Sequence, residues 1–344
     1  MMLNPEAVEA SWYGRRRLGL PARVLLTLLS WLYGAVTQIR RWLYDLGLLS
    51  RTRLPVPVIV VGNLIVGGAG KTPLTRALAQ QLRAEGWHPG IISRGYGRKV
   101  PGVRAVGVGD SPDHVGDEPL LYAADGFPVF VGEQRAAAGK ALLAANPSVD
   151  ILIADDGLQH YALARDIELV VFDQRGLGNG QLLPAGPLRE GLGRLRNPKL
   201  KGVVWQGGVQ PLKDPVAQRL PAFSMTLAPG VAYALNDRTQ ARPLTAFAGQ
   251  PVRAVAGIGH PERFFQMLRD LGLQVEGRAF PDHYHFTPQD LPKTASPVLM
   301  TEKDAVKCHE FAAGRTDVWV VPVTAQLEPP LPLENWLKRD NVRV

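Results

Sequence analysis

The most constraining feature of this 344-residue chain is an apolar run followed at once by a glycine-rich loop and a helical pattern. Residues 56–76 read VPVIVVGNLIVGGAGKTPLTR, and apolar residues then recur at helical spacing as far as Gly86. In this context glycines let backbone N–H groups turn toward phosphate oxygens, and the start of the helix adds partial positive charge. The stretch therefore predicts a phosphate-binding P-loop, formed by Gly67, Gly68, Gly70, Lys71 and Thr72.

Each polar residue of this loop has a physical task. Lys71 would reach the β- and γ-phosphates of a nucleotide, and the Thr72 hydroxyl would hold Mg²⁺. A strict P-loop pattern has glycine where this chain has Ile65, so an ordinary glycine-rich turn before a helix is the alternative. The GGAGKT core between a strand and a helix favours the phosphate site.

A second candidate site feature is a pair of acids at the end of a predicted strand, in residues 151–160, which read ILIADDGLQH. The buried-strand pattern ends in Asp155 and Asp156, where the carboxylate that holds Mg²⁺ is found beside a P-loop. Adjacent strand residues point to opposite faces, so one of the two is expected to face the metal while the strand continues. A single histidine is commonly structural, but His160 is a candidate because it follows these two acids closely.

Strands and helices alternate over much of the chain, which predicts an α/β fold. Up to about residue 200 the rhythm indicates a P-loop NTPase-like, doubly wound, mostly parallel sheet. Residues 252–273 form another strand, glycine turn and helix without a following lysine, and 318–323 is predicted as the last strand. We therefore expect a membrane-associating amino-terminal helical segment, a P-loop domain, a second, smaller α/β domain and a carboxyl-terminal tail or helix: 1–50, 51–225, 226–325 and 326–344.

The amino-terminal region carries most of the excess positive charge. Residues 13–53 contain eight arginines and one acid, while the whole chain has a formal net charge of +8. The apolar run 24–36 between these arginines is shorter than the roughly 20 residues of a standard membrane span. Together with the surrounding tryptophans and tyrosines, this pattern favours a helix that lies in the membrane interface. A signal peptide, a helix packed on the protein's own core and a nucleic-acid surface are the alternatives.

Further polar residues have both a functional and a structural interpretation. Asp117 and Glu118 come just before a helical pattern, where acids commonly interact with the helix dipole. Arg189 is a candidate phosphate or transition-state contact, and a surface ion pair with Glu190 is its alternative.

Two other groups of residues predict no metal site. Asp282, His283 and His285 lie in a proline-marked loop without a further ligand cluster, so zinc is not expected. The single cysteine, Cys308, excludes an intrachain disulfide and is expected to be a buried apolar side chain.

Taken together, the motifs resemble those of the tetraacyldisaccharide 4′-kinase family, the lipid A biosynthesis kinases of Gram-negative bacteria. The resemblance extends in order over residues 56–307 and is carried by VGNLIVGGAGKTP, ISRGYGR, GDEP, DDGLQH, LLPAGPLRE, FPDHY and TEKDAVK. The family's own loop is a GGxGKT variant, which accounts for Ile65.

The resemblance implies that ATP, with Mg²⁺, phosphorylates the 4′-hydroxyl of a tetraacylated disaccharide 1-phosphate. It implies that Asp117 and His283 form the catalytic base pair, and that two domains close over ATP. Asp155 and Asp156 join Thr72 on the metal side. Lys71 and Arg189 are counted among the catalytic residues, and the remaining residues around substrate and nucleotide are Glu118, Arg135, His160 and Glu190.

The resemblance also implies partners and a location. Because the acylated substrate stays in the bilayer, a peripheral or monotopic enzyme on the cytoplasmic face of the bacterial inner membrane is expected. Its amino-terminal helix is expected to contact membrane lipid. Neither nucleic acid nor an obligate protein partner is expected. A P-loop switch or metallochaperone-type NTPase is the alternative, but it leaves the apolar run and FPDHY unexplained. A non-enzymatic membrane or nucleic-acid binding protein leaves GGAGKT and the acid pair unexplained.

Overall fold

The computed structural model describes residues 4–208, 217–291, 293 and 296–337. The chain forms two compact units and passes between them more than once. Unit 1 comprises Met1–Gly90, Arg135–Thr226 and Leu327–Val344, and unit 2 comprises Ile91–Gln134 and Leu227–Gln326. Residues 91–134, which the sequence assigned to the P-loop domain, thus fall in unit 2. The predicted domain limits stay predictions.

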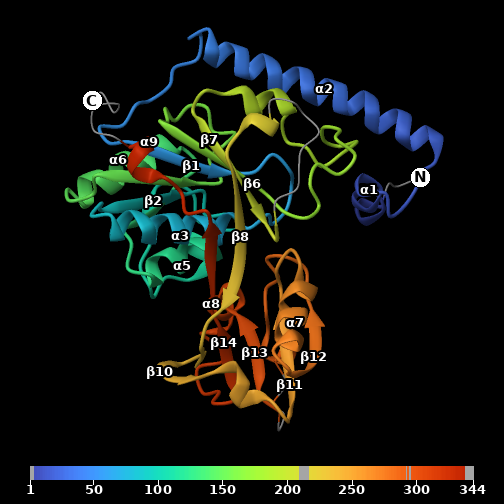
Figure 1. The fold of residues 1–344 in the computed structure, drawn as a ribbon, viewed down its shortest axis with the longest axis vertical. Helices are drawn as coiled ribbons and strands as arrows, with labels where there is room; N and C mark the ends of the chain where they lie inside the picture. Colours follow the sequence, from blue (N-terminus) through green and yellow to red (C-terminus); the bar gives the residue numbers. More distant parts are fainter. Residues whose placement is uncertain (1–3, 209–216, 292, 294–295, 338–344) are drawn as a thin grey trace. The chain divides into compact units, whose positions relative to one another are not determined.

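Unit 1 is built on a parallel sheet. Its neighbouring strands follow the order β8–β7–β6–β1–β5, and every pair is parallel. All residues of β1, β5 and β6 are buried, as expected for a parallel sheet covered on both faces. The mostly parallel α/β architecture is therefore confirmed (Figure 1). The bounds are Val58–Gly62 (β1), Ile151–Asp155 (β5), Ile167–Phe172 (β6), Leu200–Gln206 (β7) and Ala222–Pro229 (β8).

Helix α3, Lys71–Ala84, begins directly after the glycine-rich loop and packs on β1 and β5. Leu74, Leu78 and Leu82 recur at helical spacing and are fully buried, so this face anchors the helix to the sheet. The other helical segments in the described part of unit 1 are α1 (Pro5–Trp12), α2 (Leu20–Asp45), α6 (Arg135–Ala145), η1 (Leu192–Arg196), η2 (Ala217–Arg219) and α9 (Leu333–Trp336).

Helix α2 turns small and polar side chains toward the rest of unit 1. The Ser30 hydroxyl donates to the Leu182 carbonyl at 2.8 Å, and the Tyr33 hydroxyl donates to the Arg189 carbonyl at 2.9 Å. Both acceptors lie in the loop that follows β6. The helix is therefore attached to unit 1 through hydrogen bonds along one narrow side.

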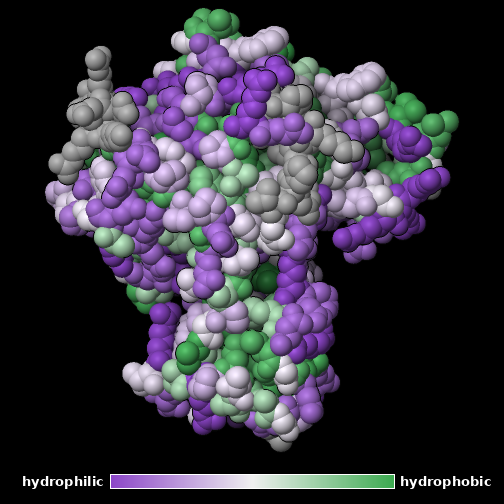
Figure 2. Space-filling view, in the orientation of Figure 1, coloured by the Kyte–Doolittle hydropathy of each residue, from purple (hydrophilic) through white to green (hydrophobic). Residues whose placement is uncertain are grey.

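The other side of α2 exposes large apolar side chains. Figure 2 shows apolar surface over both ends of this helix, which Figure 1 draws along the margin of unit 1. At 26 residues, α2 is long and apolar enough to cross a membrane, judged by length and composition alone. The expectation of a segment too short to span is therefore wrong for the helix, because it extends beyond the run 24–36 at both ends. The exposed residues are Leu20, Val24, Leu25, Leu28, Leu29, Trp31, Leu32, Val36, Ile39 and Trp42.

One part of unit 2 contains three strands and two helices. Strand β2 pairs with β4 in parallel, and β4 pairs with β3 in antiparallel orientation. A short helix, α4, and then α5 precede β4 in the chain. The bounds are Pro89–Ser93 (β2), Arg104–Ala105 (β3), Pro112–Val115 (α4), Asp117–Ala124 (α5) and Val129–Val131 (β4).

The other part of unit 2 is a six-stranded sheet with the order β10–β9–β14–β13–β11–β12. Phe264, Phe265 and Leu268 of α7 pack on one face of it, and Ala305 and Cys308 of α8 pack on the other. The cysteine is thus buried, as expected. The bounds are Ala232–Ala234 (β9), Asp237–Arg242 (β10), Pro251–Ala256 (β11), Pro261–Asp270 (α7), Gln274–Ala279 (β12), Val298–Thr301 (β13), Glu302–Cys308 (α8) and Val318–Val321 (β14).

The end of the chain differs from the sequence prediction. The last strand was expected at 318–323, but β14 ends at Val321 and a further strand, β15, covers Val323–Glu328. Pro322 separates the two because proline has no N–H to donate to a strand ladder.

Unit 1 also contains a buried ion pair, and removing one of its partners should destabilise the unit. Glu168 and Arg194 are almost fully buried and hydrogen-bonded to each other, and Arg165 contacts the same carboxylate at 3.2 Å. We expect Arg194→Gln to lower the free energy of unfolding by about 3–5 kcal/mol, because the carboxylate loses a buried partner. Urea unfolding followed by tryptophan fluorescence would measure the loss.

Arg253→Gln is the matched control for this prediction. Arg253 pairs with the exposed Glu276 at 3.1 Å, and an exposed pair contributes about 0–1 kcal/mol. Equal losses in the two variants would contradict the structural importance of the buried pair.

Candidate active site

The loop between β1 and α3 has the backbone of a phosphate cradle. Gly67 and Gly70 have φ values of +91° and +89°, a region that glycine adopts without steric cost. A Cβ at Gly70 would lie 2.7 Å from Gln206 Oε1 and 2.8 Å from Met225 Cε. The left-handed conformation therefore favours glycine immediately before Lys71, the first residue of α3, whereas the two close atoms end flexible side chains that can shift.

Asn63, a residue that the sequence reasoning missed, ties the two ends of this loop together. Its side-chain amide donates to the Gly67 carbonyl at 3.1 Å, and its Oδ1 accepts from Lys71 Nζ at 3.5 Å. The available signal was its place directly after β1. Asn63 is fully buried, so it fixes both the glycine turn and the direction of the lysine.

Arg175 is a second supporting residue that was missed. It follows β6, and its guanidinium donates to the Gly68 carbonyl at 3.2 Å. The same side chain pairs at 3.0 Å with Asp173, which is fully buried. The pattern FDQR after an apolar strand was the only signal for it, because the loop that it supports is more than 100 residues away in the sequence.

The two consecutive acids lie at the end of β5, next to this loop. Asp155 is buried as the last residue of the strand, whereas Asp156 leaves it with φ +46°. Asp156 pairs with Arg189 Nη1 at 3.0 Å and with Lys71 Nζ at 3.8 Å. A positive φ in a non-glycine residue is a strained conformation that is common at functional sites.

The carboxyl group of Asp156 is held in its charged form. Burial acts to raise its pKa, but Lys71 and Arg189 together outweigh burial, and the pKa lies below its ordinary value. Arg189 therefore pairs with Asp156, not in a surface ion pair with Glu190. The three side chains form a compact charged cluster beside the glycine loop.

Glu190 belongs to a buried network behind this cluster. It accepts hydrogen bonds from the Tyr161 hydroxyl and from Gln159 Nε2, and Arg194 Nε lies 3.7 Å away. Burial raises the pKa of Glu190 and also that of Tyr161. Since Glu190 is adjacent to Arg189 in the chain, this network fixes the backbone that carries the arginine.

His160 and Arg135 meet at the start of α6. The backbone N–H of Arg135 points to His160 Nε2 at 3.4 Å, and the Arg135 side chain is buried. The coulombic field of Arg135 also contributes to lowering the pKa of Asp156. Both residues therefore lie close to the charged cluster around Asp156.

The residues at this edge fit a nucleotide with Mg²⁺. The Thr72 hydroxyl and the two aspartates would offer hard oxygen ligands, which Mg²⁺ prefers, and its other ligands commonly come from phosphate and water. Within the described residues, no group of three or more His, Cys, Asp or Glu converges as a metal site. The left-handed glycines and Lys71 provide the donors that phosphate needs.

Unit 2 contains a second cluster, built on the first residue of α5. Asp117 is 5% exposed, and its Oδ2 lies 3.0 Å from Nδ1 of His283. His283 has φ +57°, and its ring centroid lies 4.7 Å from that of Tyr96. The pair that the resemblance implied is therefore in hydrogen-bonding contact, and its imidazole is held on two sides.

Lys303 completes this cluster and was missed as a site residue, although it lies in the motif TEKDAVK, which was the available signal. Its Nζ lies 3.1 Å from Asp282, 3.3 Å from Glu118, 3.4 Å from His283 Nε2 and 3.9 Å from Asp117. Burial acts to lower the pKa of Lys303, but the three carboxylates raise it. The lysine is therefore held as a cation.

The pKa of Asp117 reflects the same balance. Burial acts to raise it, whereas the hydrogen bond from His283 and the charge of Lys303 lower it, and the pKa lies below its ordinary value. At neutral pH the structure thus contains a buried, ionised carboxylate beside an imidazole. Such a group can accept a proton from a hydroxyl within hydrogen-bond reach.

Two glycines allow Asp117 its position. Gly95 and Gly116 have φ values of +66° and +88°, and a Cβ on Gly95 would come within 2.5 Å of the Val115 carbonyl oxygen. The motifs ISRGYGR and GDEP are therefore packed backbone to backbone. His285, by contrast, is exposed and reaches Asp113 at 4.0 Å, away from the cluster.

Comparisons with known proteins agree with the resemblance. The family model described as tetraacyldisaccharide-1-P 4′-kinase matches residues 22–341. A tetraacyldisaccharide 4′-kinase from Dechloromonas aromatica is 51% identical over 94% of both chains, and one from Chromobacterium violaceum is 51% identical over 94% of this chain and 95% of its own. The LpxK crystal structure from Aquifex aeolicus, in complex with ATP, is 32% identical with a TM-score of 0.78, covering 93% of this chain and all of that one.

The geometry of the loop predicts how the first cluster binds a nucleoside triphosphate. Lys71→Met should weaken binding of a fluorescent Mg²⁺-nucleoside triphosphate about 10- to 100-fold, because a charge-assisted hydrogen bond is worth roughly 1.5–3 kcal/mol. Lys140→Met removes an equal charge from an exposed position on α6 and should leave the affinity unchanged. Equal affinities for wild type and Lys71→Met would remove the lysine from the phosphate site.

Proposed function

Because the chain belongs to the tetraacyldisaccharide-1-P 4′-kinase family, we propose that it transfers the γ-phosphate of ATP to the 4′-hydroxyl of a tetraacyldisaccharide 1-phosphate. The product would be the 1,4′-bisphosphorylated lipid. The observation that carries this proposal is a glycine loop with Lys71 and Asp156 in one unit, together with an ionised Asp117 on His283 in the other.

Unit 1 is assigned the phosphate donor. Backbone N–H groups at Gly67, Gly68 and Gly70 and the start of α3 would hold the phosphate oxygens. Lys71 and Arg189 would neutralise the charge that spreads over the transferred group, which is the main task of a phosphoryl-transfer enzyme. Thr72 with Asp155 or Asp156 would hold Mg²⁺, which supplies further charge neutralisation on the phosphate oxygens.

The cluster of unit 2 is assigned the activation of the acceptor. A sugar hydroxyl is a weak nucleophile, and Asp117 would accept its proton as the bond to phosphorus forms. His283 would orient the carboxylate through its Nδ1 contact. Lys303, held by Asp282 and Glu118, would keep Asp117 ionised and is a positioning residue in this scheme.

Helix α2 is assigned to the membrane. The family's substrate is acylated, and the exposed apolar face of α2 matches an interfacial helix. A peripheral or monotopic protein on the cytoplasmic face of the inner membrane follows, since ATP is available there. Neither nucleic acid nor an obligate protein partner enters the scheme.

The test of the reaction is transfer from labelled ATP, with Mg²⁺, to tetraacyldisaccharide 1-phosphate in detergent micelles. Labelled bisphosphorylated lipid is the expected product. Release of free phosphate without a labelled lipid would favour the alternative, a P-loop switch or metallochaperone-type NTPase.

The first kinetic prediction concerns Asp117, the residue assigned as the base. Asp117→Asn keeps the size of the side chain and loses the proton acceptor, so kcat should fall about 10²- to 10⁴-fold. Asp125→Asn, at the other end of α5, is the matched control and should retain normal turnover. Near-normal kcat in Asp117→Asn would remove this residue from the mechanism.

The second kinetic prediction concerns the positive charge of Lys303. Removing it in Lys303→Gln should raise the pKa of Asp117, which the lysine now lowers. The base is active when ionised, so the acid limb of the kcat/KM–pH profile should move to higher pH. Lys99→Gln, an exposed residue paired with Asp113, should leave the limb in place. An unshifted limb in Lys303→Gln would show that the lysine does not control the base.

A further inference from the structure

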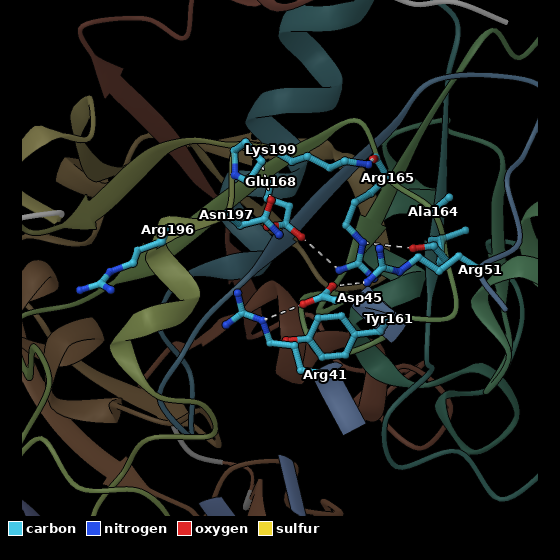
Figure 3. A pocket seen from close by; sticks show the side chains of 12 residues that line it. Arg41, Asp45, Arg51, Tyr161, Ala164, Arg165, Glu168, Arg196, Asn197 and Lys199 are labelled. Atoms are coloured by element: carbon cyan, nitrogen blue, oxygen red, sulfur yellow. Dashed lines mark hydrogen bonds and ion pairs between the residues drawn. The ribbon is translucent and has the colours of Figure 1, made fainter. Parts of the chain in front are cut away.

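A cavity of about 320 Å³ opens in unit 1 beside the carboxyl-terminal end of α2. Arg41 and Asp45 of α2 line it together with Arg51 from the segment that follows. Its other wall comes from the loops before β6 and β7, which contribute Arg165 and Lys199 (Figure 3). None of these five residues belongs to the glycine loop or to the cluster around Asp156.

The cavity is rich in cations. Five cationic side chains line it, and the two carboxylates among its lining residues are Asp45 and Glu168. Glu168 is fully buried and already bonded to Arg165 and Arg194. The remaining carboxylate, Asp45, pairs with Arg41 and Arg51. The potential inside is therefore positive.

The cations are arranged to receive an anion. Arg41 Nε and Arg51 Nη2 approach Asp45 at 3.6 and 2.6 Å from two sides, as Figure 3 shows. Lys199 Nζ is held by the Arg165 carbonyl at 2.5 Å, and burial together with the nearby Arg53 and Arg165 lowers its pKa although Asp166 opposes this. Arginine forks match the geometry of phosphate oxygens.

The position of the cavity indicates where the anion comes from. Three exposed apolar residues lie at the same end of the helix: Trp42, Leu46 and Leu48, which are 57%, 74% and 69% exposed. If this end enters the apolar–polar boundary of a bilayer, as the membrane docking proposed above requires, Arg41 and Arg51 lie at the depth of lipid headgroups.

We propose that this cavity, the α2 anion pocket, binds the phosphate group of an anionic membrane lipid. The inference rests on the proposed membrane docking of α2 and adds a specific headgroup site to it. An incoming phosphate would share Arg41 and Arg51 with Asp45, and Lys199 would contribute its charge from the inner wall.

The test compares variants of equal charge on vesicles. Arg41→Ala/Arg51→Ala removes two charges from the pocket, and Arg16→Ala/Arg17→Ala removes two from the segment before α2. Binding of the full chain to phosphatidylglycerol vesicles is measured by sedimentation, and thermal unfolding confirms that each variant is folded. The pocket variant should lose at least tenfold more affinity than the control variant. Equal losses, which diffuse attraction to a charged surface would give, overturn the proposal.

A variant that removes a negative charge from the pocket provides an independent check. Asp45→Asn releases both arginines and should tighten binding to phosphatidylglycerol vesicles several-fold. Glu9→Gln, which neutralises an exposed acid on α1, should have a smaller effect. An effect of the same size in both variants would count against a built site.

Two further measurements distinguish a lipid headgroup from free phosphate as the ligand. They also distinguish failure of the pocket proposal from failure of the membrane docking. On neutral phosphatidylcholine vesicles, wild type and pocket variant should bind alike. If calorimetry shows pocket-dependent binding of inorganic phosphate while the vesicle affinities of the two proteins are equal, the ligand is a soluble phosphate and the lipid assignment is wrong. If wild type binds neither kind of vesicle, the membrane docking fails as well. If it binds both kinds equally, the pocket proposal alone fails.

Discussion

The donor site depends on the register between two central parallel strands. Val61 of β1 lies opposite Asp155 of β5, so the glycine loop that follows β1 and the acid pair that ends β5 leave the sheet at the same edge. Once this register is set, Lys71 comes within 3.8 Å of Asp156. A slip of one residue would turn the acids to the other face, because side chains alternate along a strand. Both strands are fully buried, so such a slip would also disrupt the packing of the side chains around them.

The two charged clusters solve one electrostatic problem in the same way. In each, a carboxylate has lost contact with water, almost completely at Asp117 and in part at Asp156, which favours the neutral form. Cations then reverse the balance: Lys71 and Arg189 lower the pKa of Asp156, and His283 and Lys303 lower that of Asp117. Charges held in place before the reaction need little reorganisation during it, which is how preorganised sites stabilise charge that develops in a transition state.

Sequence reasoning located residues correctly where their position depends on the local sequence pattern. The P-loop residues and the acid pair follow strands directly, so periodicity and residue type were enough to find them. It failed where a role depends on a distant contact. Arg175 supports a loop more than 100 residues away, and Lys303 gains its role only because α8 packs beside α5. The partner of Arg189 was missed for the same reason: its neighbour in the chain was considered, whereas the carboxylate that it contacts is 33 residues away.

The orientation of α2 argues that water is not its only solvent. In an ordinary surface helix the apolar stripe faces the protein, but here Ser30, Tyr33 and Arg41 face it together with the single buried leucine, Leu26, while most leucines and both tryptophans are exposed. Fully burying such a side chain is worth about 1.5–3 kcal/mol, and a bilayer would recover part of that energy for each exposed one. The inward hydrogen bond from Tyr33 ends on the carbonyl of Arg189, whose guanidinium pairs with Asp156. The helix assigned to the membrane and the arginine assigned to the donor site therefore share one backbone support.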